Sequence, residues 1–465
     1  MTPVYRGDLL GNMTPSALKK LDCELNEFLD EMISGMGRPE RRSAMGHYIT
    51  GLLLDGERKS IQPMAARLAK DQTNADAMRQ RLQDCVSISA WSDAELFRRL
   101  AIKLERELPG TEVFVTDDTG FAKKGTHSVG VARQYSGTLG RTDNCQVATS
   151  LHLAGEKGSG CIGFRLYLGK EWMNERERCR VAGVPEDVEF KKKWQIALDL
   201  IDAAIEWGLE KRPVLADAGY GETPAFREGL TQRGLLYVVG VPSNHLIWPP
   251  GTHPQPPKQG KVGRPPKQWL DGNTKPIKIS KLVEGIPCER YKTVTWREGT
   301  RGKMTAKFLA FRVRPAEDHD RGKPPAQEQW LLCEWQPGEK NPRFFFATLP
   351  ADLSLRALVR VTKLRWRVER DYQDLKGEIG LDHFEGRTWR GFHHHAALCA
   401  AAHAFLALRR ALFPPEQREM DSARGSASPA ADFASTHRLV SALRPSSGRS
   451  FATPSAFADV RSCEP

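Results

Sequence analysis

Apolar residues at helical spacing dominate the first hundred positions of the chain. Behind a Thr-Pro pair, the apolar residues of 14–33 recur every three or four positions, which is typical of an amphipathic helix. Two further stretches, 60–68 and 92–108, continue the pattern, and the second opens on a Ser-x-x-Glu capping box. We therefore expect residues 1–105 to form a helical N-terminal domain.

From residue 112 the helical spacing gives way to alternation. Short runs rich in Val, Ile and aromatic residues are separated by Gly-rich turns, as in paired strands. A helical stretch at 190–209 precedes two more apolar runs, so that strand, helix and strand alternate. We therefore expect residues 106–242 to form the first part of a mixed α/β core. The expected strands are 112–118, 129–137, 146–155, 161–169, 213–217 and 234–242.

Residues 243–350 combine a loop with a second group of strands. Residues 245–269 are dense in Pro, Gly and Lys, which predicts a linker. Alternating apolar runs then return, so we expect 243–350 to hold a linker and a β-rich unit. The expected strands are 289–298, 303–313, 329–336 and 343–349.

The last part of the chain is predicted to be helical and then disordered. Apolar residues at helical spacing cover about 353–380 and again 392–412, so we expect residues 351–412 to complete the α/β core. Residues 413–465 are rich in Ser, Ala, Pro and Arg, which predicts a disordered tail.

Charge and cysteine usage narrow the function classes. Lysine and arginine exceed aspartate and glutamate by 69 − 57 = 12, which suits a polyanionic partner such as nucleic acid, although a well-solvated surface explains the same excess. No apolar run approaches the roughly 20 residues that span a bilayer, so we expect no membrane partner. The nine cysteines form no Cys-x-x-Cys pair, which argues against structural zinc and a disulfide framework and favours the cytoplasm.

Two adjacent carboxylates follow the first apolar strand. In VFVTDDTG, the strand is expected to end at Asp117 and Asp118, whose side chains point to opposite faces because strand residues alternate. A lone aspartate at such a place is often only a turn residue. The stretch VLADAGYGE repeats the arrangement with Asp217, and sites gather at the carboxyl ends of strands in α/β sheets.

A third acidic residue lies on the helix expected at 353–380. Arg365, Glu369 and Lys376 are spaced by four and seven positions, so they project from one helical face. Alone, this spacing is explained as well by a solvated face with ion pairs. Together with the two strand-end aspartates, however, Glu369 could complete a set of three carboxylates that holds two divalent cations.

Three stretches around these acids resemble a known family. They are DDTGFAKKGTHSVGVARQYSGTLGRTDNCQ, VLADAGYGE and LRWRVERDYQDLKGEIGLDHFEGRTWRGFHHHA. In this order they resemble the DDE-class transposases of bacterial insertion sequences, close to the insertion sequence 701 family. The relatives carry Tyr, Arg, Glu and Lys at set spacing on the catalytic helix. Arg365, Glu369 and Lys376 keep this register, and Thr362 stands where the relatives have Tyr.

The resemblance implies an RNase H-like catalytic core and roles for its residues. It selects Asp118 over Asp117, because the relatives have an Asp followed by Thr-Thr or Thr-Gly. Asp118, Asp217 and Glu369 are then the catalytic and metal-binding residues for two Mg²⁺ ions, with Mn²⁺ as a substitute. Four residues are then expected to contact DNA phosphates: Arg365, Lys376, Lys123 and Lys124. For Lys123 and Lys124, a solvated turn is an equal alternative.

The resemblance also implies a reaction and partners. Such an enzyme cuts double-stranded DNA at transposon ends and joins the 3′-hydroxyls to target DNA, as a homodimer on paired ends. Residues 1–105 are then expected to bind DNA, and residues 243–350 to hold a β-rich insertion. One alternative is an RNase H-like nuclease that does not join DNA. The other is a domesticated, non-catalytic DNA-binding protein, against which the complete set of three acids argues.

Aromatic and histidine residues offer weaker signals. Trp296, Trp330 and Trp335 could stack on an extruded base, but core packing is favoured because alternating strands bury such rings. The histidines of 393–395 are consecutive, so on a helix they point in different directions and do not form a metal site. We expect them to pack or to contact DNA.

Overall fold

The structure, a computed structural model, describes residues 15–69, 72–257, 268–299, 302–317, 319 and 322–412. The expected disordered tail at 413–465 and the basic GKVGRPPK stretch of the expected linker lie outside the described residues. Within the described ranges, no helix combines the length and apolar character needed to cross a membrane.

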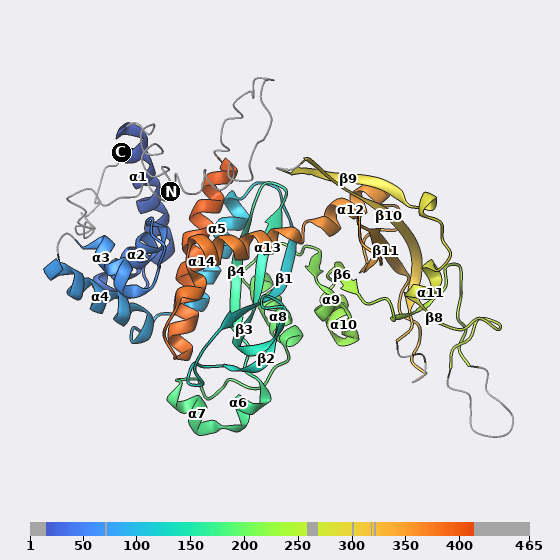
Figure 1. The fold of residues 1–465 in the computed structure, drawn as a ribbon, viewed down its shortest axis with the longest axis horizontal. Coiled ribbons are helices and arrows are strands. Elements are labelled where there is room, and N and C mark those ends of the chain that lie inside the picture. Colours follow the sequence, from blue (N-terminus) through green and yellow to red (C-terminus); the bar gives the residue numbers. More distant parts are fainter. Residues whose placement is uncertain are drawn as a thin grey trace, which may run out of the picture.

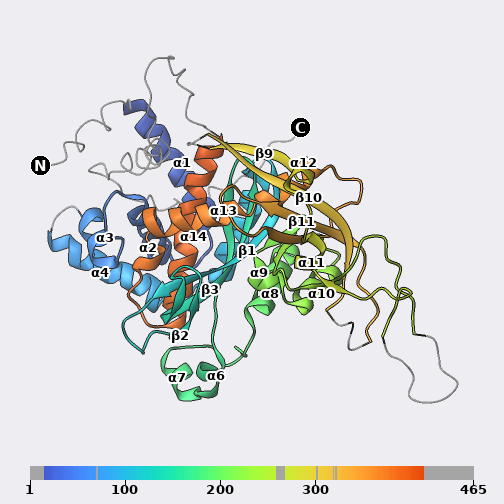
Figure 2. The ribbon, with the colours of Figure 1, turned by 45° about the vertical axis from the view of Figure 1, so that its right-hand side comes forward.

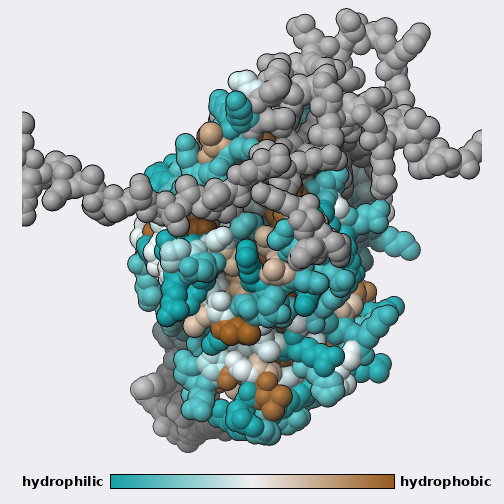
Figure 3. Space-filling model, turned by 90° about the vertical axis from the view of Figure 1, so that its left-hand side faces the viewer, coloured by the Kyte–Doolittle hydropathy of each residue, from teal (hydrophilic) through white to brown (hydrophobic). Residues whose placement is uncertain are grey.

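Within the described residues, five helices precede the sheet, in the region where helical spacing predicts helices. They lie beside the last helix, α14 (Trp389–Leu412), which packs against the sheet, and the fifth of them also contacts the sheet directly (Figure 1). Helix α14 is buried along most of its length, and the three histidines of 393–395 pack inside with it, as predicted. On the outer face of this helical part, Figure 3 shows mainly hydrophilic residues with isolated hydrophobic ones. The five helices are α1 (Pro15–Ile33), α2 (Pro39–Leu53), α3 (Ile61–Leu68), α4 (Gln72–Ser87) and α5 (Asp93–Glu107).

A mixed sheet forms the centre of the molecule. Its central strand β1 (Thr111–Ala122) pairs antiparallel with β3 (Arg141–Gly155) and parallel with β5 (Val214–Ala216). Strand β6 (Tyr237–Val241) continues the parallel part beside β5. On its other edge, β3 pairs antiparallel with β2 (Ala132–Ser136) and β4 (Ser159–Leu166).

The second group of strands joins this sheet rather than forming another. Strand β12 pairs antiparallel with β6, so the sheet runs on through twelve strands (Figure 2). This backbone pairing couples the region between Asp217 and Glu369 directly to the central strands. The added strands are β7 (Leu246–Trp248), β8 (Ile277–Lys278), β9 (Lys292–Gly299), β10 (Gly302–Pro315), β11 (Gln329–Trp335) and β12 (Arg343–Ala347).

Shorter helices cover the sheet and its connections. Helix α8 (Lys193–Glu206) packs against β3 and β4, and the short helix α9 (Ala218–Gly221) lies against β6. The others are α6 (Lys170–Asn174), α7 (Arg176–Val181), α10 (Pro224–Gln232), α11 (Ile279–Val283), α12 (Leu355–Lys363) and α13 (Trp366–Gln373).

Strand β1 is longer than the sequence predicts. The expected end at Asp118 is wrong, because β1 continues to Ala122 and its residues past Asp118 stay paired with β3. The pairing of Gly120 with Val147 shows why: a neighbouring strand supplies backbone partners where the local sequence suggests a turn. Asp117 and Asp118 therefore lie within a strand and keep their opposite faces.

The single helix expected at 353–380 is divided. Helix α12 ends at Lys363, α13 runs from Trp366 to Gln373, and a π-helical turn follows at Asp374–Glu378. Near the division, the Thr362 hydroxyl donates to the Leu358 carbonyl at 2.7 Å, a contact that often bends helices. The division lets α12 and α13 follow different parts of the sheet surface.

A buried polar network attaches α13 to the sheet. The Asp371 carboxylate accepts hydrogen bonds from His152 and Ser159, each at 2.6 Å. Ser150 links His152 to the Tyr372 hydroxyl, which also donates to the backbone carbonyl of Asp117 at 3.1 Å. Burial alone would raise the pKa of Asp371, but the hydrogen bond from His152 and the nearby histidine charges lower it. The network therefore contains a buried carboxylate that its partners hold in the charged form.

Replacing Asp371 is expected to destabilise the fold strongly. Asp371→Asn leaves His152 without its charged partner in a buried site, which costs about 3–5 kcal/mol of the free energy of unfolding. Urea denaturation measures the change. The control is Asp199→Asn, whose carboxylate forms a surface ion pair with Lys191 and contributes at most about 1 kcal/mol. Equal midpoints for the two variants would contradict the structural role of the network.

Candidate active site

Asp117 lies on the face of β1 that α13 covers. Its neighbours on that face, Val113 and Val115, belong to the same hydrophobic cluster as Leu364 and Val368. The Asp117 carboxylate forms an ion pair with Arg365 at 3.0 Å. Burial raises the pKa of Asp117 to about 7 even though the Arg365 charge lowers it, and the charges of Asp217 and Asp118 add to the rise.

Arg365 connects the strand with the helix. Its guanidinium also forms an ion pair with Glu369, four residues further along the chain, whose side chain is exposed. Burial disfavours the charged guanidinium, but Asp117, Glu369 and Asp217 outweigh this effect and raise the pKa of Arg365. One cation thus interacts with three carboxylates that come from two strands and a helix.

Asp217 follows β5 and caps the short helix α9. Its carboxylate accepts a hydrogen bond from the Tyr220 backbone N–H at 3.3 Å. Two glycines let α9 lie against β6: a Cβ on Gly221 would lie 1.9 Å from the Gly240 carbonyl oxygen, and one on Gly240 would lie 2.7 Å from the Ala218 nitrogen. Gly221 therefore permits a close approach of α9 to β6 that a side chain would block.

Asp118 points to the opposite face of β1. It forms an ion pair with Lys193 at 2.9 Å, accepts a hydrogen bond from Thr149 at 3.0 Å and accepts another from the Tyr220 hydroxyl. The structure therefore differs from the motif-based expectation. Asp117, and not Asp118, shares a face with Arg365, because alternation along β1 directs Asp118 toward α8 and α9.

The lysines predicted to bind phosphate differ in whether their ammonium groups already donate hydrogen bonds within the protein. Lys376 donates to the Gly120 carbonyl at 2.8 Å, and burial lowers its pKa to about 8. Lys123 donates to the Phe384 carbonyl at 2.9 Å. Both ammonium groups donate to backbone carbonyls here, and their contact with DNA phosphates stays a prediction. Lys124 is exposed, and Arg365 is engaged by its carboxylates.

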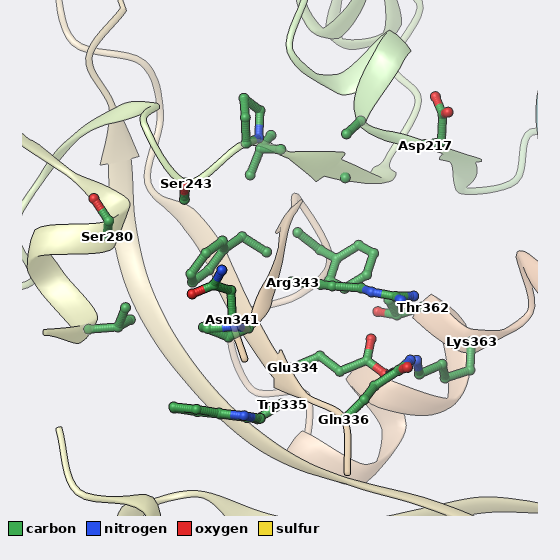
Figure 4. Close-up of a pocket in the computed structure, with 18 of the residues that line it drawn as sticks. Asp217, Ser243, Ser280, Glu334, Trp335, Gln336, Asn341, Arg343, Thr362 and Lys363 are labelled. Atoms are coloured by element: carbon green, nitrogen blue, oxygen red, sulfur yellow. Dashed lines mark hydrogen bonds and ion pairs between the residues drawn. The ribbon is translucent and has the colours of Figure 1, made fainter. Parts of the chain in front are cut away.

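A cavity of about 1080 Å³ opens beside Asp217 and extends between the core and the added strands. Figure 4 shows Asp217 on one side of it and Arg343 and Lys363 on the other. Trp296 and Trp330 pack partly on the core, as predicted, while Trp296 also lines the cavity. Its other walls include aromatic and basic residues, which lie beside the acidic Glu284, Glu334 and Glu369: Trp335, Trp366, Arg297, Lys340, Arg343 and Lys363.

Several residues at this site were not predicted from the sequence. Trp366 lies between the guanidinium groups of Arg297 and Arg367, whose central carbons are 3.8 and 4.5 Å from its ring centre. Apolar neighbours do not distinguish Asp117 from Asp118, because β1 is buried on both faces, by Val113 and Val115 on one and by Phe114 on the other. The partners of Tyr220 likewise had no local signal, since they come from distant strands.

The donor set suits a hard divalent cation. Carboxylate oxygens are the ligands that Mg²⁺ prefers, and Asp117, Asp217 and Glu369 supply them around Arg365. Among the residues that the structure describes, no three His, Cys, Asp or Glu side chains are already grouped as a metal site. The chemistry of the donors therefore fits a metal, while the Arg365 guanidinium occupies the space between Asp117 and Glu369.

Comparisons with known proteins identify a family model and a sequence relative that match this chain. Residues 31–303, more than half of the chain, match the family model described as DDE superfamily endonuclease. The chain is 32% identical over 214 residues to a probable transposase for insertion sequence element IS701 from Microchaete diplosiphon. That alignment covers 45% of this chain and 52% of the relative, so it spans about half of the relative's length.

A solved structure matches the chain over most of its length. It is the piggyBac transposase synaptic complex with hairpin DNA, with a TM-score of 0.37 and 10% sequence identity over 97% of this chain and 89% of that one. The extent of the family-model match decides the assignment: the chain belongs to the DDE superfamily endonucleases and is related to insertion-sequence transposases.

Proposed function

We propose that the chain is a DNA transposase that cuts at transposon ends and transfers the cut strands to target DNA. The observation that carries the proposal is the gathering of Asp117, Asp217 and Glu369 around Arg365, in a chain of the DDE superfamily endonucleases. The strand order β4–β3–β1–β5–β6, with β1, β5 and β6 parallel, supports an RNase H-like core for residues 106–242 and 351–412.

The carboxylates are proposed to hold two Mg²⁺ ions. Bound there, the ions would polarise a phosphodiester, activate a water or 3′-hydroxyl and stabilise the leaving oxygen. Arg365 would orient the phosphate, since a guanidinium offers two parallel hydrogen bonds to phosphate oxygens. Its present ion pairs with Asp117 and Glu369 keep it at the place where that phosphate is needed.

The partners and the domain division belong to the same proposal. Double-stranded DNA is proposed as the substrate at both steps, bound by a homodimer on paired ends. The helical residues 1–105 are proposed to bind DNA, and the strands of 243–350 to form the insertion beside the active site. The basic and aromatic residues that line the cavity support contact between this insertion and DNA.

The first aspartate of the catalytic set is proposed to be Asp117, with Asp118 as the alternative. Contact with Arg365 and the influence of the Asp217 charge support Asp117. The Asp-Thr-Gly register of the motif supports Asp118, which reaches Tyr220 beside Asp217 on the other face.

Single substitutions separate the two aspartates. Asp117→Asn and Glu369→Gln are expected to abolish cleavage, because each removes a metal-binding carboxylate. Asp118→Asn is expected to retain cleavage at a rate about 10–100-fold lower, as for residues that support metal ligands. The measurement is cleavage of a duplex carrying one end of the chain's own element in Mg²⁺, with the surface variant Asp199→Asn as the control. Loss of cleavage in Asp118→Asn with retention in Asp117→Asn would assign the catalytic role to Asp118.

Removal of the metal is expected to stop both steps reversibly. A chelator should eliminate cleavage and joining by the wild-type chain, and added Mg²⁺ or Mn²⁺ should restore them, because the proposed site has no other source of Lewis acidity. Gel analysis with pre-cut ends and target DNA follows the joined product. Restored cleavage without joined product would support the nuclease alternative, and cleavage in the chelator would contradict the metal mechanism.

A further inference from the structure

Tyr220 lies between the two acidic groups of the sheet and contacts both. Its phenol is 3% exposed and packs against Phe226, with ring centres 5.4 Å apart. The phenol hydroxyl donates to the Asp118 carboxylate, and the backbone N–H of the same residue donates to the Asp217 carboxylate at 3.3 Å. One side chain therefore fixes the turn that carries Asp217 to the central strand β1.

Side chains from several elements contact the Asp118 carboxylate. Thr149 on β3 donates to it at 3.0 Å, and Lys193 at the start of α8 forms an ion pair with it at 2.9 Å. These contacts leave the Asp118 carboxylate in a defined orientation, so it can act as a fixed acceptor for Tyr220. Burial and the nearby Asp118 charge raise the pKa of Tyr220 well above its usual value, so the phenol stays protonated and remains a donor.

We infer that Tyr220 and Asp118 form a positioning pair that fixes Asp217 in the orientation needed to bind metal. The inference rests on the proposed function, because it gives Asp118 a supporting role in the same site. The backbone N–H of Tyr220 engages one Asp217 oxygen, and the hydroxyl prevents the turn 217–221 from shifting relative to β1. Gly221 and Gly240 allow the turn to sit close to β6, but packing alone gives it no polar tie to β1.

The hydroxyl can be removed without removing the ring. Tyr220→Phe keeps the packing against Phe226 and is expected to weaken Mn²⁺ binding by about 10-fold and slow cleavage by about 10-fold, within the range for residues that support metal ligands. Mn²⁺ affinity is measured by electron paramagnetic resonance on the chain without DNA, and cleavage on the end duplex in Mg²⁺. The double variant Asp118→Asn/Tyr220→Phe should bind Mn²⁺ and cleave no less than the more impaired of the two single variants. Both substitutions remove the same interaction, so their effects should not add.

The matched control is Tyr237→Phe. Its phenol is also buried, and its hydroxyl donates to Gln329 at 2.8 Å, away from the carboxylates. This variant should lose similar thermal stability while keeping Mn²⁺ affinity and cleavage. The inference is overturned if Tyr220→Phe matches Tyr237→Phe in both measurements, or if the effects of the Asp118 and Tyr220 substitutions multiply.

A third variant separates this inference from the proposed function. Glu369→Gln tests the catalytic site itself, because it removes a carboxylate and leaves Tyr220 untouched. If Glu369→Gln is inactive while Tyr220→Phe behaves like the wild type, the positioning role fails and the proposed function stands. If Glu369→Gln binds Mn²⁺ and cleaves normally, the proposed function itself fails.

Discussion

The arrangement of the site depends on one partly buried guanidinium between a strand and a helix. Arg365 binds Asp117 on β1 and Glu369 on α13, and it lies close enough to Asp217 for that charge to act on it. Without this cation, three carboxylates near one another would repel, and each would be costly to keep ionised where it is buried. Arg365 therefore stabilises a cluster of carboxylates, the ligand type that hard divalent cations prefer.

The rest of the core anchors the two elements that this contact joins, the strand β1 and the helix α13. Asp371 and Tyr372, next along α13, reach back to β3 and to the Asp117 backbone through His152 and Ser150. The pairing of β12 with β6 extends the same sheet into the added strands, whose Glu334 forms a buried ion pair with Lys363 on α12. The helix α13 that carries Glu369 and the preceding helix α12 are thus each anchored by polar contacts whose buried groups would be costly to leave unpaired.

Periodicity predicted most elements, and it failed where long-range pairing decides the outcome. The end of β1 was misplaced because Thr119 and Gly120 suggest a turn, yet β3 offers them backbone partners. The i,i+4 spacing of Arg365 and Glu369 is visible in the sequence, and so is their shared face. The contact of His152 with Asp371 joins residues 219 positions apart, and neither residue carries a local signal of its partner. Asp117 was passed over because a motif register says nothing about which face a helix covers.

Two adjacent aspartates in a strand pose an electrostatic problem that the two faces of the sheet resolve separately. Charges on neighbouring residues repel, and the Asp118 charge does raise the pKa of Asp117. Each carboxylate has its own cation, Arg365 on the α13 face and Lys193 on the α8 face. Because β1 lies between them, the two ion pairs have separate partners, and only the charges of Asp117 and Asp118 act on each other through the strand. A cation that displaced Arg365 from Asp117 would leave the contacts of Asp118 with Tyr220 and Thr149 unchanged, so the turn carrying Asp217 would stay in place while the charge on the other face changed.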